Sequence, residues 1–571
     1  MNFLQSPLAR RPRLLGRKII FRLGLHRGDV RVPVPAVAAV TYPAHWAQAL
    51  RAWIQTVPLA SAPHPFHRVF RQEFDEALLL KLCREGPRRG ENGLTGDIKL
   101  VWDYSRGQPL LTNAAASPEH LEFCAAFLRR WMEANADTNG PAWSCAMEIA
   151  IRAANWIFAD VLFGGELGGQ LGTSDWARWL WCDGWLVWQR LEARLVSSNH
   201  YLADLLGLFL VGAIFPEDAH ARRWHRFARS EFPRALLAQT RGDGGLGEAS
   251  LRYHAFVTEM ALLFRLAQGA PFPPAAEVRL RDMCRIVADF RDATGDVFAL
   301  GDDDSGRVLA VDFASPVSRA DSLLRLAAAV LGEEFKPSAG AVYPESGWWV
   351  RRAGDFAVAL DFGGVGLHGR GSHAHNDDFT FCLDWRERTV IADPGTFLYT
   401  SDRAARNRFR STFFHNTLAV DGREQRELSD EPFLLPGRDK AFPATRLGED
   451  AWAFQRPVGP AITHRREISV RCESVSIRDV VEGSGRHKLQ WRFQLHPAVQ
   501  PSVTPRGFTL VVPKVGTLLL EAPQTLSALD IVESEYSPGY GCRQPALVCV
   551  VSHEVTLPFS AEWRIRAVDK P

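Results

Sequence analysis

The sequence predicts an α+β multidomain protein, in which stacked helical hairpins precede a large antiparallel β-sandwich. A chain of 571 residues is too long for a single hydrophobic core, so we expect at least two domains. Before about residue 340, apolar residues recur at helical spacing in long blocks; after it, the runs are short, alternating and separated by tight turns. This change of pattern separates the two predicted parts.

The helical pattern is clearest in three blocks, at residues 185–196, 200–215 and 257–268. Breakers such as Pro216 and the glycine-rich residues 242–245 separate blocks of this kind. We therefore predict helices joined by short turns, without a repeat of fixed period.

The strand pattern appears at residues 348–363, 379–395, 464–483 and 508–522. Strand periodicity with polar turns at this frequency is typical of an antiparallel sandwich. Residues 333–346, which contain two prolines and one glycine, are the predicted hinge. The predicted domains are an N-terminal arm with the first helices over 1–95, a helical domain over 96–335 and a β-sandwich domain over 340–571.

Composition limits the partners that this protein can have. A net charge of +2 provides no global field for nucleic acid, and no apolar stretch is long enough to span a bilayer. The basic segment from Arg10 to Arg27 lacks the apolar core of a secretory signal, so we expect a cytoplasmic location. That segment is expected to fold onto the first domain or to contact an anionic membrane surface weakly. Nine scattered cysteines argue against a disulfide framework.

The densest group of chemically active residues lies in the second part. His373 and His375 are two residues apart, so on an extended strand they share one face. A predicted hairpin over residues 379–392 brings Asp393 near His375, and His415 follows. Two imidazoles and a carboxylate suit a Zn²⁺-type site. A hydrogen-bonded network of buried histidine and aspartate is the alternative.

In the helical part, the segment VSSNHYLADLLG breaks one helix and restarts it at Asn199 and His200. Amide and imidazole donors at a helix N-terminus suit an anion such as a carboxylate. The alternative is that Ser198 or Asn199 only caps the helix.

A glycine-rich loop leads into a predicted helix that carries Glu248, Arg252 and Tyr253. Glu248 and Arg252 have the spacing of an ordinary helical ion pair. A tyrosinate beside cationic groups can abstract a proton, whereas a helical tyrosine can also serve packing alone. The run Asp302–Asp304 lacks the spacing of an EF-hand, so we expect a solvated loop or a cap there.

Taken together, these segments resemble the heparinase II/III-like polysaccharide lyases, which include alginate and heparan-sulfate lyases. The resemblance runs from about Asp97 to the C-terminus. It rests on an ordered series of motifs: DIKLVWDYSR (97–106), EIAIRAANW (148–156), SSNHYL (197–202), DGGLGEASLRYH (243–254), GDDDSGR (301–307), SHAHNDDF (372–379), ADPGTFLY (392–399) and RSTFFHNTL (410–418). The family commonly carries glutamate where this chain has Asp103.

The resemblance implies an (α/α) toroid followed by an antiparallel β-sandwich, and cleavage of uronic-acid glycosides by β-elimination. It implies that Asn199 and His200 neutralise the uronate carboxylate, and that Tyr253 and His373 are catalytic. By the same resemblance His375, Asp393 and His415 are metal ligands, usually for structural zinc, although another divalent metal would also fit. Secreted members of the family begin with a signal peptide, so a periplasmic location is the alternative to a cytoplasmic one.

The chemistry requires removal of the C5 proton of a uronate and a neutralised carboxylate, so that the developing enolate is tolerated. Either Tyr253 or His373 would be the base, depending on the stereochemistry at C5. Candidates for substrate contact are Arg406, Arg408, Arg410 and Glu248. We expect the active site between the two parts, with an acidic polysaccharide or oligosaccharide as the substrate.

Two other functions stay open. A glycoside hydrolase would need two carboxylates, which Asp243 with Glu248, or the run Asp302–Asp304, would supply. The chain would otherwise be a non-catalytic polysaccharide-binding component of exopolysaccharide assembly, because fold alone does not set function.

Overall fold

The computed structural model describes residues 37, 39–59, 62–87, 93–193, 196–310, 318–523 and 528–568. The basic N-terminal segment, and with it the predicted membrane contact, lies outside these residues. No helix among the described residues combines the length and the apolar character needed to cross a membrane.

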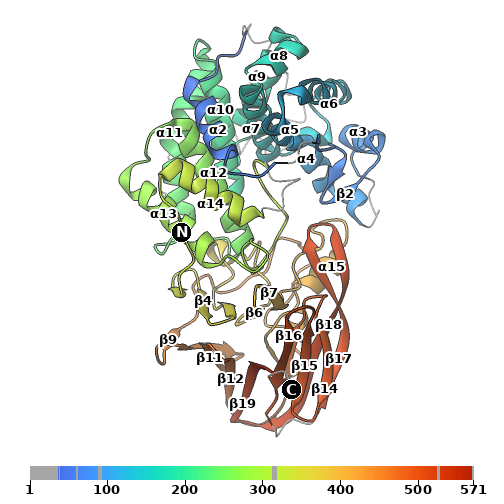
Figure 1. Cartoon of the computed structure of the whole chain (residues 1–571), viewed down its shortest axis with the longest axis vertical. Helices are drawn as coiled ribbons and strands as arrows, with labels where there is room; N and C mark the ends of the chain where they lie inside the picture. Colours follow the sequence, from blue (N-terminus) through green and yellow to red (C-terminus); the bar gives the residue numbers. More distant parts are fainter. Residues whose placement is uncertain are drawn as a thin grey trace. The chain divides into compact units, whose positions relative to one another are not determined.

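The chain divides into two compact units, which are described separately (Figure 1). The first contains the described residues up to Thr240, with Ala255–Cys284 and those from Gly306 to Phe335. The second contains Arg241–His254, Arg285–Ser305 and the described residues from Lys336 onward. The second unit therefore takes in two segments that precede the β-strands in the chain, and one of them carries Tyr253.

The first unit is helical, apart from the short strands β1 (Arg68–Val69) and β2 (Gln72–Glu73). Its helices are α2 (Ala44–Ile54), α3 (Glu76–Glu85), α4 (Ile98–Arg106), α5 (Pro109–Ala116), α6 (Leu121–Ala134), α7 (Ala146–Leu162), α8 (Glu166–Leu171), α9 (Thr173–Arg190), α10 (Asn199–Ile214), α11 (Ala219–Gln239) and α14 (Arg319–Leu331), with most of α12 (Leu251–Gln268) and α13 (Pro274–Asp289).

Helix α7 is buried along nearly its whole length and packs against α10. The two helices approach closely because Gly207 has no side chain: a Cβ there would lie 2.6 Å from the Cβ of Ala150. The predicted restart of the helix at Asn199 is confirmed. The prediction of helix through residue 196 is wrong beyond Arg190, since Leu191 has a non-helical ψ of 127° and the Asp204 carboxylate accepts a hydrogen bond from the Glu192 backbone at 2.6 Å.

The second unit is built on three antiparallel sheets. The sheet orders are β14-β15-β16-β19-β12-β11-β10-β9, β17-β18-β13-β8 and β3-β4-β5-β6-β7. The strands are β3 (Gly340–Tyr343), β4 (Trp348–Ala353), β5 (Phe356–Asp361), β6 (Phe381–Trp385), β7 (Arg388–Ile391), β8 (Leu418–Val420), β9 (Ala444–Arg446), β10 (Ala451–Val458), β11 (Ile462–Arg471), β12 (Ser474–Glu482), β13 (Arg486–Gln494), β14 (Gln500–Thr504), β15 (Gly507–Val512), β16 (Gly516–Glu521), β17 (Ala528–Gly539), β18 (Cys542–Thr556) and β19 (Phe559–Ala567). A short helix, α15 (Arg403–Phe409), follows β7.

Each of the four runs with strand periodicity forms an antiparallel hairpin, namely β4–β5, β6–β7, β11–β12 and β15–β16. Alternation places one face of most strands in a single core, which includes Trp349, Leu383, Ile468, Trp491 and Leu518 from all three sheets. The predicted class, a helical (α/α) toroid followed by an antiparallel β-sandwich, is confirmed. Part of the predicted hinge forms strand β3.

The nine cysteines are all free thiols, as their scattered positions predict. Six of them are buried.

A buried polar group inside the sandwich gives a prediction about pH. His464 contacts Asp479 at 2.7 Å, and Asp479 also accepts hydrogen bonds from Arg466. Burial lowers the pKa of His464 to about 4, although Asp479 opposes this shift. In the unfolded chain histidine titrates near pH 6.5, so between that pH and about 4 the unfolded state binds more protons. The free energy of unfolding should therefore fall on acidification across this window, by about 3 kcal/mol in full.

Urea denaturation at pH 7 and at pH 4 tests this expectation. His464→Gln keeps a donor for Asp479 but has no titrating ring, so its stability should fall by less between the two pH values than that of the wild type. An equal fall in the two proteins would show that His464 does not titrate in this way.

Candidate active site and metal centre

Tyr253 and His373 stack on each other within the second unit. Their ring centroids are 3.8 Å apart at an interplanar angle of 22°, and both side chains are buried. The Tyr253 hydroxyl lies 3.2 Å from the Tyr399 hydroxyl, and the Arg406 guanidinium lies over the Tyr399 ring at 4.9 Å. A phenol and an imidazole that the sequence separates by 120 positions thus form one cluster.

Asp302 connects this cluster to the predicted metal ligands. One of its oxygens lies 3.1 Å from His373 Nδ1, and the other lies 2.8 Å from His375 Nε2. Arg406 donates to both oxygens, one of these bonds being 2.8 Å long. Burial opposes the charge, but Arg406 and the two histidines hold the pKa of Asp302 well below its usual range. The carboxylate is therefore ionised and fixes both imidazole rings.

Local sequence explains how these segments meet. Gly301 has φ +73°, and a Cβ there would lie 2.4 Å from the Ala249 carbonyl and 2.9 Å from that of His373, so only glycine allows this approach. The Ser250 side chain accepts a hydrogen bond from the Tyr253 backbone at 3.2 Å and donates to the Asp302 carbonyl at 2.6 Å. Ser250 thereby caps α12 and holds Tyr253 beside Asp302.

Two expectations for this region are wrong. Glu248 precedes α12 rather than lying on it, because Ala249 adopts φ 55°, a left-handed conformation that ends the turn before the helix. The two residues of the expected helical ion pair have different neighbours. Arg252 pairs with Asp296 and approaches Asp292. The Glu248 carboxylate lies 3.5 Å from His373 Nε2. The run Asp302–Asp304 is buried rather than solvated.

The predicted metal ligands do come together. One potential ligand atom from each of His375, Asp393 and His415 lies within 4.8 Å of the others, and all three side chains are buried. His415 Nδ1 lies 2.8 Å from an Asp393 oxygen. His375 Nδ1 and His415 Nε2 are buried and have no hydrogen-bond partner in the described part of the chain. Buried ring nitrogens without partners are costly, so this donor set fits a divalent ion.

The three arginines proposed as substrate contacts have other partners. Arg406 is buried against Asp302, and buried Arg410 donates to the backbone carbonyls of Ser429 at 2.6 Å and of Leu434 at 3.2 Å. Arg408 is partly exposed and pairs with Glu535 at 2.6 Å. The burial of Arg406 and Arg410 argues against direct contact with a polysaccharide, because their donors are already used within the fold.

Asn199 and His200 open α10 in the first unit. Asn199 is buried, whereas a third of the His200 side chain is exposed. His200 Nδ1 lies 3.1 Å from a Glu192 oxygen. Burial lowers the pKa of His200, but the Glu192 carboxylate and the neighbouring Cys145 outweigh this and raise it well above its usual value.

Tyr253 has anionic rather than cationic surroundings. Burial raises its pKa well above the usual value, and the charges of Asp304 and Asp302 add to the shift. The tyrosinate considered from the sequence is therefore disfavoured, and the phenol keeps its proton at neutral pH.

Sequence reasoning missed two residues of this cluster. Tyr399 stands at the end of the motif ADPGTFLY, and its rarity among only eight tyrosines was the available signal. Asp302 stood in an acidic run that resembles many surface loops, and only its pairing with Arg406, 104 residues away, shows its role.

Comparison with known proteins agrees with this architecture. The family model described as "Heparinase II/III N-terminus" matches residues 191–286, and the one described as "Heparinase II/III-like, C-terminal" matches residues 336–564. Together they match more than half of the 571 residues. No curated protein is found to match the sequence.

Solved structures share the fold. A heparinase III structure matches with a TM-score of 0.66 at 14% identity, over 99% of this chain and 93% of that one. Another, the heparinase III BT4657 gene product, matches with a TM-score of 0.59 at 15% identity, over 100% and 93%. The heparan sulfate lyase HepC from Pedobacter heparinus matches with a TM-score of 0.54 at 16% identity, over 92% and 89%.

Fold and matched models together define the class of the protein, that of the polysaccharide lyases, which are carbon–oxygen lyases. The chain belongs to the heparinase II/III-like family.

Proposed function

We propose that this protein cleaves a uronic-acid-containing acidic polysaccharide by β-elimination and leaves 4,5-unsaturated uronate ends. The stacked pair of Tyr253 and His373, with Asp302 holding the imidazole, is the observation that carries the proposal. Elimination needs a proton acceptor near C5 and a proton donor near the departing O4. A phenol and an imidazole in contact can supply both. The names of the similar structures, heparinase and heparan sulfate lyase, support an anionic polysaccharide as the substrate.

The electrostatics of the pair suggest how the two roles are divided. Burial, with the charges of Asp304 and Asp302, raises the pKa of Tyr253, so the phenol keeps its proton and suits donation to O4. If His373 donates its Nδ1 proton to Asp302, Nε2 keeps the lone pair that accepts a proton from C5. We therefore propose His373 as the base and Tyr253 as the acid, with Glu248 as a polar neighbour of His373 Nε2.

Neutralisation of the uronate carboxylate is assigned to Asn199 and His200. Hydrogen bonds and positive charge at the carboxylate stabilise the enolate that forms when the C5 proton leaves. A third of the His200 side chain is exposed, and its Nδ1 lies against Glu192, so Nε2 can donate to the substrate carboxylate. His200→Ala should therefore lower kcat/KM for a uronate polymer, by about 10²-fold if one charge-stabilising contact is lost. Steady-state kinetics on the preferred polymer measure this, and unchanged kinetics would exclude His200 from this role.

An ion held by His375, Asp393 and His415 would stabilise the fold around the active histidine. We propose zinc, since one carboxylate and two imidazoles suit it. His375 lies two residues from His373, and Asp302 contacts both imidazole rings. An ion that fixes the His375 ring would therefore help to orient the His373 ring.

Elemental analysis tests this metal site. His415→Ala should contain one ion fewer per chain than the wild type, and its thermal midpoint should fall by about 5 °C or more, because the stabilisation by the ion is lost. His553→Ala serves as the control, because His553 lies on β18, outside this group. Equal metal content in His415→Ala and the wild type would exclude these ligands.

Two of the carboxylates that a glycoside hydrolase could use, Asp243 and Asp302, have other partners. Asp243 accepts hydrogen bonds from the Glu345 and Ser346 backbone and from the Ser346 hydroxyl, at 2.6–2.8 Å. Asp302 is bound to Arg406 and two histidines. Neither is available as a free acid or base, which supports elimination over hydrolysis.

The proposed activity is tested by ultraviolet absorbance on a panel of heparan-type, alginate-type and bacterial acidic polysaccharides. The wild type should generate an absorbing unsaturated uronate from at least one of them. Binding without absorbing product on every polymer would instead support a polysaccharide-binding component.

A further inference from the structure

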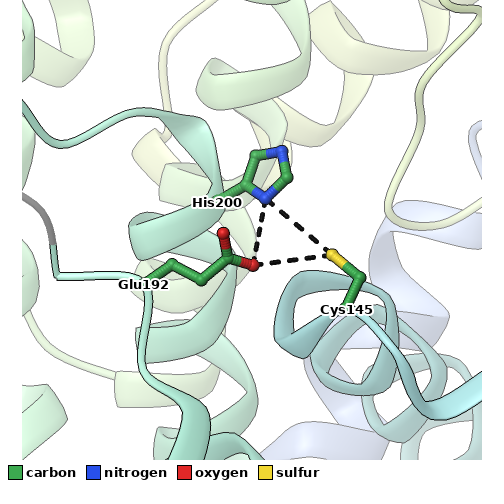
Figure 2. Close-up of side chains that lie close together, drawn as sticks. All are labelled: Cys145, Glu192 and His200. Atoms are coloured by element: carbon green, nitrogen blue, oxygen red, sulfur yellow. Dashed lines mark hydrogen bonds and ion pairs between the residues drawn. The ribbon is translucent and has the colours of Figure 1, made fainter. Parts of the chain in front are cut away.

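A second group of metal-binding side chains lies in the first unit, apart from the residues of the predicted metal site. Cys145 precedes α7, Glu192 follows α9, and His200 is the second residue of α10. Figure 2 shows that the thiol, one carboxylate oxygen and Nδ1 of the imidazole point toward one another. Three different segments therefore direct a sulfur, an oxygen and a nitrogen ligand atom to one place.

The spacing of the three atoms matches one face of a zinc coordination tetrahedron. Zinc bonds of about 2.3 Å to sulfur and about 2.0 Å to nitrogen or oxygen, at tetrahedral angles, separate the ligand atoms by roughly 3.3–3.6 Å. The observed separations are 3.5 Å from Cys145 Sγ to Glu192 Oε1, 3.9 Å from Sγ to His200 Nδ1, and 3.1 Å from Nδ1 to Oε1. Shifts of a few tenths of an ångström would complete the coordination.

The fold holds these ligands in place before any ion arrives. The close contact of α7 and α10 at Gly207 and Ala150 sets the distance between the starts of the two helices, which carry Cys145 and His200. Asp204 fixes the backbone of Glu192. Cys145 is 8% exposed and a third of the His200 side chain is exposed, so the group is shielded on one side and open on the other.

We propose that Cys145, Glu192 and His200 bind a zinc-like divalent cation at a second metal site. A thiolate, a carboxylate and a neutral imidazole together carry two negative charges, which balance a divalent ion. The thiol proton and the Nδ1 proton of a charged His200 pass to solvent as the sulfur–metal and nitrogen–metal bonds form. Three protein ligands leave a fourth position for water, as in open zinc sites.

Such an ion would also set the tautomer of His200. With Nδ1 bound to the ion, the proton of the neutral ring resides on Nε2, which would donate to an anion. This consequence rests on the proposed function, in which His200 neutralises the substrate carboxylate. Occupancy of the site does not depend on that function.

Cobalt(II) titration of the full-length His415→Ala protein tests the proposal, because this background weakens the other metal site, which contains no sulfur. One equivalent of cobalt should produce a thiolate-to-cobalt charge-transfer band in the near ultraviolet. The band should vanish on adding Cys145→Ser and persist on adding Cys182→Ser, whose partly exposed thiol lies on α9. Circular dichroism checks that each variant is folded.

A second measurement avoids cysteine variants. The zinc X-ray absorption spectrum of His415→Ala loaded with one equivalent should show a single sulfur ligand. Absence of a thiolate band at stoichiometric cobalt, persistence of the band in Cys145→Ser, or a zinc shell without sulfur would each overturn the second site. A sulfur-ligated ion in a protein without lyase activity would overturn the proposed function and leave this site standing.

Discussion

Tyr253→Phe should lower the rate of unsaturated-uronate formation by about 10²–10⁴-fold, which is the usual contribution of a general acid or base. The substitution keeps the ring that stacks on His373 and removes only the hydroxyl, which lies 3.2 Å from that of Tyr399. We therefore expect the free energy of unfolding to change by about 1 kcal/mol at most. Initial rates by absorbance and urea denaturation of the same preparations measure the two effects.

Two matched variants separate proton transfer from packing. Tyr399→Phe loses the same hydroxyl contact without losing the proposed acid, so its rate should fall by about tenfold or less. Tyr343→Phe, which removes a hydroxyl bonded to Asp289, should keep the wild-type rate. Retained activity in Tyr253→Phe would remove Tyr253 from its role.

The division of roles has its own test. A uronate that carries fluoride in place of O4 needs no proton at its leaving group. Tyr253→Phe should regain most of its activity on this substrate, whereas His373→Ala should remain inactive. The opposite pattern would make Tyr253 the base and His373 the acid.

Asp302→Asn should destabilise the second unit by about 3–5 kcal/mol, since it leaves the Arg406 guanidinium buried without its counter-charge. Activity should fall as well, because His373 and His375 lose the carboxylate that orients them. Because Asp302 acts through His373, any residual activity should also show a shifted pH dependence of kcat/KM. Loss of stability alone would not cause such a shift.

An exposed aspartate–arginine pair in the same unit provides the control. Asp355 and Arg386 are 2.7 Å apart, and about half of each side chain is exposed. Asp355→Asn should cost less than about 1 kcal/mol, since water screens the pair. Equal losses of stability in Asp302→Asn and Asp355→Asn on urea denaturation would contradict the structural role of Asp302.

Features of the fold that depend on neighbouring residues could be predicted from the sequence pattern. Alternating apolar residues and polar turns placed the four hairpins, and the turn at Arg386-Glu387 is confirmed by φ values of 49° and 57°. The hairpin over residues 379–392 predicted that Asp393 lies near His375, because one hairpin determines where its ends lie.

Contacts between distant segments could not be predicted in this way. Nothing near Asp302 in the sequence indicates Arg406 as its partner, and nothing near Arg410 indicates that backbone carbonyls would use its donors. Glu248 was assigned to a helix because its spacing to Arg252 fits one, whereas the left-handed Ala249 separates them. The Cys145 group is invisible in sequence for the same reason, since it draws on three separate segments.

The mass of the cleavage products tests the central claim most directly. The polymer that the protein cleaves is digested in ¹⁸O-labelled water. β-Elimination predicts new non-reducing ends that absorb in the ultraviolet and are lighter by one water molecule than those of hydrolysis. The new reducing ends on the other fragments should carry no label beyond slow exchange. Saturated ends carrying one added water would contradict the account and would identify the protein as a hydrolase.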